Sequence, residues 1–168
     1  MDGAPAPHPA QALAAELRRR FAADQAARGA RDWPAMDRVD AENTAWLKSA
    51  VAAGGWPRLA DVGREGATHA WLLAQHADAD PGFQEEALRL LTAAVAAGEA
   101  LPEHQALLTD RVRVNAGQPQ LYGTQYAGDP DSTRVRPHPI EDPERLDERR
   151  AAVGLEPHAV YDRRMRGG

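Results

Sequence analysis

The chain contains no cysteine, a single lysine and two serines among its 168 residues. Without cysteine, disulfide bonds and thiolate catalysis are excluded. Ser49 and Ser132 do not lie in the Gly-x-Ser-x-Gly pattern of a hydrolase nucleophile, so covalent serine catalysis is not expected. The absence of disulfides is typical of proteins in the reducing cytoplasm, where we expect this chain to reside.

Long apolar runs and a strong positive charge are absent as well. No run approaches the roughly 20 apolar residues that span a bilayer, and residues 1–9 lack the basic and apolar regions of a signal peptide. A formal net charge of −5 argues against nucleic acid as a partner. No Gly-rich phosphate loop is present. We therefore expect a small-molecule ligand and neither a nucleic acid nor a membrane, while no sequence feature predicts the oligomeric state.

Apolar residues at helical spacing predict a mainly α fold, a compact orthogonal bundle of about five or six helices. Leu13, Leu17 and Phe21 mark the first helix, which Gly29 and Pro34 should close, and Asp40 is the expected cap of the second. The remaining helices are expected over 64–77, 81–98, 102–112 and 143–153.

A small β-hairpin is predicted near residues 112–125, where Val112-Arg113-Val114 alternates before the turn signal Asn115-Ala116-Gly117. Residues 127–143 are rich in proline and predict a long ordered loop or a flap. The expected organisation is a disordered segment over 1–9, one helical domain over 10–161 and a frayed tail over 162–168.

The first candidate for chemistry is His76, at the predicted end of a helix. The negative end of the helix dipole favours the protonated ring and suits it to acid–base work. Asp78 or Asp80 could orient the ring. The alternative is that His76 and Asp80 are capping residues, and for Asp80 the cap is favoured because Pro81 follows it.

Two further groups carry polar side chains. Arg111 could bind a carboxylate or phosphate with its planar guanidinium, and Asp110 beside it could accept a proton or hold a histidine. The alternative for this pair is a surface ion-pair partner next to an exposed arginine. Downstream, glutamines, a tyrosine and a threonine surround Gly123 and could orient a polar ligand or form a polar edge hairpin; they are Gln118, Gln120, Tyr122, Thr124 and Gln125.

A metal site has weaker support. His76, Asp78 and Asp110 are the ligands expected if a divalent ion binds, but there is no His-Glu-x-x-His motif, EF-hand loop or Cys/His array. We therefore predict no cofactor.

Three blocks in order resemble a bacterial domain family of unknown function: Gln75-His76-Ala-Asp-Ala-Asp-Pro-Gly-Phe-Gln84, Leu108-Thr-Asp110-Arg111-Val and Gln120-Leu-Tyr122-Gly-Thr124-Gln125. The similarity would cover about residues 38–161. It implies that the polar residues of the blocks, Gln84 included, belong to one site, and it carries no activity or cofactor.

Two functions of different classes follow. In an enzyme of hydrolase, lyase or isomerase type, His76 would be the general acid–base, Asp110 or Asp78 would orient it and Tyr122 could donate a proton. A small anionic substrate would then be bound by Arg111, Gln84, Gln120, Thr124 and Gln125. In a non-catalytic binding domain, the same amides and Arg111 would recognise a small ligand or a peptide, and His76 would be a structural cap.

Overall fold

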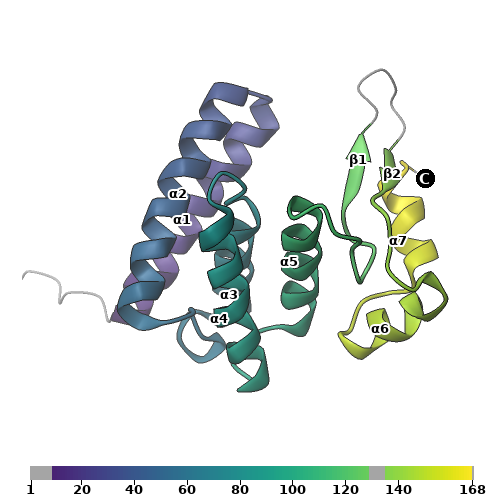
Figure 1. Cartoon of the computed structure of the whole chain (residues 1–168). Helices are drawn as coiled ribbons and strands as arrows, with labels where there is room; N and C mark the ends of the chain where they lie inside the picture. The colour runs from purple at the N-terminus through teal and green to yellow at the C-terminus, as the bar shows by residue number, and fades with distance from the viewer. Residues whose placement is uncertain (1–8, 129–134, 168) are drawn as a thin grey trace, which may run out of the picture.

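The structure is a computed structural model that describes residues 9–128 and 135–167. Five helices form the larger part of the fold (Figure 1): α1 (Pro9–Ala30), α2 (Trp33–Gly54), α3 (Leu59–Gln75), α4 (Pro81–Ala96) and α5 (Pro102–Asn115). Helix α3 packs on α1, α2 and α5, and α4 packs on α5. The buried apolar core lies among these helices and includes Leu17, Leu47, Leu73, Leu91 and Leu108.

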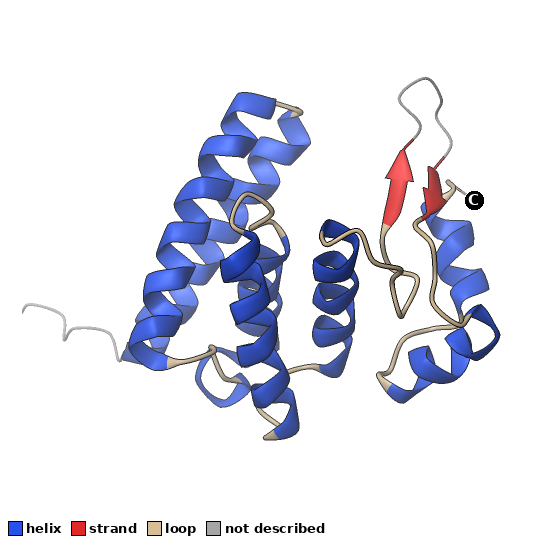
Figure 2. Cartoon of the chain, viewed as in Figure 1, coloured by secondary structure: helices blue, strands red, loops and turns tan. Residues whose placement is uncertain are grey.

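A smaller C-terminal part lies beside α5 (Figure 2). It contains strands β1 (Tyr126–Gly128) and β2 (Val135–Pro137), the 3-10 helix η1 (Pro143–Arg145), α6 (Leu146–Ala152) and α7 (His158–Met165). The two strands pair antiparallel, with Tyr126 opposite Pro137. The prediction of a mainly α fold with a small hairpin is confirmed.

Several boundaries differ from the sequence expectation. Pro34 does not end a helix but lies in the first turn of α2, because Asp32 caps that helix through the N–H of Ala35, and Asp40 is internal. Helix α5 continues to Asn115, so the paired strands lie at 126–128 and 135–137 rather than within 112–125. The expected cap of α4 is confirmed, since Asp80 accepts the N–H of Phe83 at 3.0 Å.

The expected ends also differ in part. Residues 1–8 and the middle of the predicted flap, 129–134, lie outside the described residues, whereas Pro9 already belongs to α1. The expected tail over 162–168 begins inside α7, which continues to Met165 and is tied by an ion pair between Asp162 and Arg166. Over the part of the chain that the structure describes, no helix has the length and apolarity to cross a membrane.

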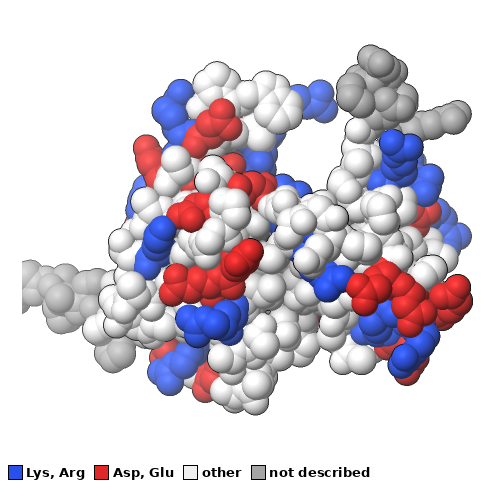
Figure 3. Space-filling view, viewed as in Figure 1, with Lys and Arg blue, Asp and Glu red and all other residues white. Residues whose placement is uncertain are grey.

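Charged residues of both signs are distributed over the surface. On the face shown in Figure 3, basic and acidic side chains are interspersed. Several charged side chains of the described residues form ion pairs, such as Lys48 with Asp80 and Arg18 with Glu65. This face therefore presents no broad surface of a single sign.

Candidate functional site

His76 directly follows α3 as its C-cap residue, and its ring meets a buried carboxylate of α1. Its Nδ1 atom lies 2.7 Å from Oδ1 of Asp24, which is 1% exposed. Arg28, one turn further along α1, contacts both side chains and also donates to Asp40 of α2 at 2.8 and 2.9 Å. Three helices therefore contribute to a single cluster of Asp24, Arg28, Asp40 and His76, which we call the His76 cluster.

The geometry assigns the position of the His76 proton. Burial by itself would raise the pKa of Asp24, but hydrogen bonds from His76 and Gln25 and the charge of Arg28 lower that pKa below its ordinary value. Asp24 is therefore ionised at neutral pH and can only accept, so the 2.7 Å contact requires a proton on Nδ1. The Nε atom of Arg28 also lies 3.1 Å from Nδ1 of His76, but a protonated Nδ1 cannot accept, so the Nε–H is shared between the two Asp24 oxygens, at 3.2 and 3.3 Å.

The other ring nitrogen of His76 is left available. Its side chain is 18% exposed, and its Nε2 atom makes no hydrogen bond to a described residue and is not among the buried unpartnered atoms. A neutral imidazole with its proton on Nδ1 carries a lone pair on Nε2. The cluster therefore presents a proton acceptor to solvent and holds it from behind with a carboxylate.

Among the described residues, the acidic and histidine side chains close enough together to hold a metal ion are those of the His76 cluster. Ligand atoms of Asp24, Asp40 and His76 lie within 4.8 Å of one another. Arg28 contacts all three and already supplies a positive charge there. A divalent ion would have to displace that guanidinium, so the donor set fits a metal poorly. Asp78 and Asp110, the other ligands considered from sequence, are not part of this group.

Asp110 serves a different purpose, because its two oxygens are filled by one loop. Its carboxylate accepts the backbone N–H groups of Leu121, Tyr122 and Thr124 at 2.7 to 3.2 Å and the Thr124 hydroxyl at 2.9 Å. The side chain is fully buried. Asp110 thus fixes the loop after α5 in the way that a capping carboxylate fixes a helix end.

The glutamines of this loop are satisfied in the same manner. The side chain of Gln120, which is fully buried, donates to the carbonyls of Gln125 and His138 at 3.0 Å and accepts the N–H of Gln125 at 2.8 Å. The Gln125 amide donates to the hydroxyl of Thr124 at 3.0 Å. These bonds join the loop to the segment that leaves β2, and they leave the Gln120 side chain no access to solvent.

Arg111 lies at the surface end of the same network. It makes a two-pronged ion pair with Asp78 and donates to Oε1 of Gln125 at 3.3 Å. Asp78 also accepts from Asn115 at 2.8 Å and from Gln84 at 3.1 Å. Burial would raise the pKa of Asp78, but these partners, Arg111 foremost, lower it below its ordinary value.

The structure therefore divides the predicted site residues between two places. Six of them lie in one continuous hydrogen-bonded network, which we call the loop network: Gln84, Asp110, Arg111, Gln120, Thr124 and Gln125. Tyr122 contributes its backbone to that network, whereas burial raises the pKa of its phenol. His76 belongs to the separate His76 cluster, and the carboxylate that orients it is Asp24 rather than Asp110 or Asp78.

Sequence reasoning missed the α1 and α2 members of the His76 cluster. A signal for one of them was available: Leu17, Phe21 and Asp24 follow one another on the apolar stripe of α1, so a carboxylate occupies a position expected to be buried. Neither Arg28 nor Asp40 carried such a signal, because charged residues on a helix surface are usually solvated.

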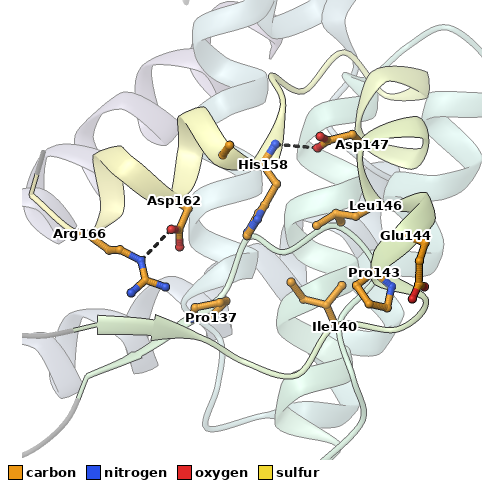
Figure 4. A pocket seen from close by; sticks show the side chains of 10 residues that line it. Pro137, Ile140, Pro143, Glu144, Leu146, Asp147, His158, Asp162 and Arg166 are labelled. Atoms are coloured by element: carbon orange, nitrogen blue, oxygen red, sulfur yellow. Dashed lines mark hydrogen bonds and ion pairs between the residues drawn. The ribbon is translucent and has the colours of Figure 1, made fainter.

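His158 and Asp162 of α7 were also missed. They line an open cavity of about 510 Å³ beside β2 and α6 (Figure 4). The phenol of Tyr126 lies 3.2 Å from Nε2 of His158 and donates to Asp162 at 2.9 Å. No local sequence pattern places His158 against Gly123, and only the fold brings the two together.

The fold and these clusters define a mainly α domain whose predicted site residues belong to two separate hydrogen-bonded groups, the His76 cluster and the loop network. The family model described as Family of unknown function (DUF6624) matches residues 15–167, so the chain belongs to this family. The expected resemblance to a family of unknown function is thereby confirmed. Neither a curated protein nor a solved structure shows a significant match to the chain.

Proposed function

We propose that this protein is a small, cofactor-independent enzyme that uses the Asp24–His76 pair as its general acid–base group. The observation that carries the proposal is the 2.7 Å bond from Nδ1 of His76 to a buried carboxylate, with Nε2 left unpaired. A ring held in this way accepts a proton from a substrate or from water at Nε2 and returns it later in the reaction. The negative charge of Asp24 stabilises the imidazolium formed in between.

The position of Arg28 favours a substrate that carries a negative charge. Its guanidinium adjoins the His76 ring, its side chain is 27% exposed and its Nη1 atom makes no hydrogen bond to a described residue. This free N–H group is a donor for a carboxylate or phosphate next to the base. Arg111, the clamp expected from sequence, would first have to release Asp78. The reaction classes that fit are those of a hydrolase, lyase or isomerase acting on a small polar anion.

The proposed setting is the cytoplasm, with a small molecule as partner and no nucleic acid. Support for this comes from the absence of cysteine, the net charge of −5 and the interspersed charges in Figure 3.

Turnover of a substrate panel tests the proposal. The panel contains 4-nitrophenyl esters and phosphates together with hydroxy acids that dehydrate or isomerise. For any substrate turned over, His76→Gln should lower kcat by about 10²- to 10⁴-fold, the usual contribution of a general base, while the melting temperature stays nearly unchanged. The matched control is His138→Gln, a histidine outside the His76 cluster. An equal rate in the His76→Gln variant would refute the proposal.

A non-catalytic binding domain is the second candidate. It is favoured by the location of the 510 Å³ cavity, which lies beside α7 rather than at His76. The polar groups of the loop network bond to one another, so their presence requires no catalytic role. On that account the purified protein turns over no member of the panel and His76→Gln leaves ligand affinity unchanged.

A further inference from the structure

The cavity beside α7 has the size and the mixed lining of a small-molecule site. Its volume of about 510 Å³ falls within the range of about 300–1,000 Å³ typical of such sites. Ile140, Pro143 and Leu146 give it an apolar wall, while His158 and Asp162 enter from α7 (Figure 4). None of these residues belongs to the His76 cluster, so the cavity is unrelated to the proposed acid–base group.

The hydrogen bonds of Tyr126 assign the tautomer of His158. Side-chain bonds from Arg166 and Tyr126 outweigh the effect of burial and lower the pKa of Asp162 below its ordinary value, so this carboxylate only accepts. Tyr126 has one proton and gives it to Asp162 at 2.9 Å, so its oxygen must accept the N–H of His158 Nε2 at 3.2 Å. Neutral His158 therefore carries its lone pair on Nδ1, which has no hydrogen bond to a described residue and is not a buried unpartnered atom.

The acidic groups around the cavity outnumber the basic ones. Glu144, Asp147 and Asp162 line it together with a single arginine, Arg166, whose Nε donates to Asp162 at 2.7 Å. Among the described residues, the carboxylate of Glu144 has no hydrogen-bond or ion-pair partner. The lining thus combines an excess of negative charge with a bare nitrogen acceptor.

The His158 ring is fixed in place before any ligand arrives. Its backbone N–H donates to Asp147 at 2.7 Å, and its edge lies over Gly123. A Cβ atom at position 123 would lie 2.8 and 2.9 Å from the ring atoms Cδ2 and Nε2. Because only glycine leaves room for this contact, the ring is preorganised and little ordering is needed on binding.

We propose that this cavity binds a small organic ammonium ion, that is, a protonated primary amine on an apolar body. The ammonium group donates one N–H to Nδ1 of His158 and faces the carboxylates of Glu144 and Asp147. The apolar body packs on Ile140 and Leu146. The bonds combine charge with direction, which favours an amine over a neutral alcohol of equal shape.

Isothermal titration calorimetry at pH 7.5 with phenethylamine, 2-phenylethanol and 3-phenylpropionate tests this assignment. We expect saturable binding of the amine, at least about tenfold weaker binding of the alcohol, and no binding of the carboxylate. Binding of the alcohol as tight as that of the amine, or no saturable binding of the amine, would overturn the proposal. The heat of binding is read without turnover, so this outcome is independent of the His76 assignment.

Two variants locate the site, with Glu148→Gln as the matched control because Glu148 lies one residue from Asp147 and pairs with Arg145 outside the cavity. Glu144→Gln should weaken phenethylamine binding about fivefold, and His158→Phe, which keeps a ring over Gly123, should weaken it at least as much. Glu148→Gln should leave it unchanged. Equal affinity in all three variants would refute the cavity as the site. Glu144 is exposed, so its variant remains informative if His158→Phe does not fold.

Discussion

Asp24 and Asp110 are both buried aspartates on helices, 1% and 0% exposed, and they differ in the groups that they hold. Asp110 is surrounded by backbone N–H groups and one hydroxyl, none of which titrates near neutral pH. Asp24 instead faces an imidazole whose second nitrogen reaches solvent. A carboxylate saturated by backbone donors fixes architecture, whereas one that orients an accessible imidazole can take part in proton transfer.

Asparagine substitutions should separate the two aspartates most strongly. Asp110→Asn leaves one oxygen for four donors and turns an amide N–H₂ toward the rest, so we expect a loss of about 3–4 kcal/mol of unfolding free energy. Asp24→Asn still offers an oxygen to His76 and should cost about 1–2 kcal/mol. Urea denaturation measures both, with the exposed Asp37→Asn as control. Equal losses would contradict the comparison.

Gly123 tests whether the loop network is locked against α7. Gly123 (φ +67°) and Gly117 (φ +71°) share a left-handed backbone, but only at Gly123 would a Cβ meet the His158 ring. Gly117→Ala should therefore cost about 1 kcal/mol and Gly123→Ala about 2–3 kcal/mol. Adding His158→Ala to the Gly123→Ala variant removes the ring that the new Cβ meets, so it should recover the stability that Gly123→Ala loses beyond the loss in Gly117→Ala. If the two single variants were equally stable, the close approach would not hold the loop.

His104, a histidine with no hydrogen bond to a carboxylate of the described residues, should make the stability of the fold depend on pH. Burial lowers the pKa of His104 to about 4, and its ring stacks on Trp71 at 4.8 Å. The stabilisation by the neutral ring is complete above the unfolded value of about 6.5 and is lost as the pH falls toward 4. The titration of His104 alone should then lower the free energy of unfolding by about 2 kcal/mol between pH 7 and pH 5. His104→Gln should remove that part of the urea-denaturation pH dependence, and His138→Gln should retain it.

The sequence predicted the helices better than the site. The Asp80-Pro81 start of α4 was readable because a cap and a first-turn proline are local signals. Pro34 was misread as a terminator because a proline ends one helix and begins another with equal ease, and the cap at Asp32 decided between the two. The hairpin was displaced because packing carried α5 through Val112 to Asn115.

The polar blocks could be found from sequence, but their partners could not. Asp110, Gln120 and Thr124 do meet, because they lie within one turn-forming segment and its preceding helix. The partner of His76 lies 52 residues upstream on another helix. No local pattern encodes that pairing, and only the packing of α1 on α3 creates it.

Nitrogen-detected NMR of the histidine rings at neutral pH tests the central claim most directly. In the ¹⁵N-labelled protein, assigned with His76→Gln, the account predicts a His76 ring protonated at Nδ1 and bare at Nε2, and loss of this fixed tautomer in Asp24→Ala, which offers the ring no acceptor. A ring protonated at Nε2 in the wild type, or a tautomer unaffected by Asp24→Ala, would contradict the assignment of Asp24 and His76 as a proton-transfer pair.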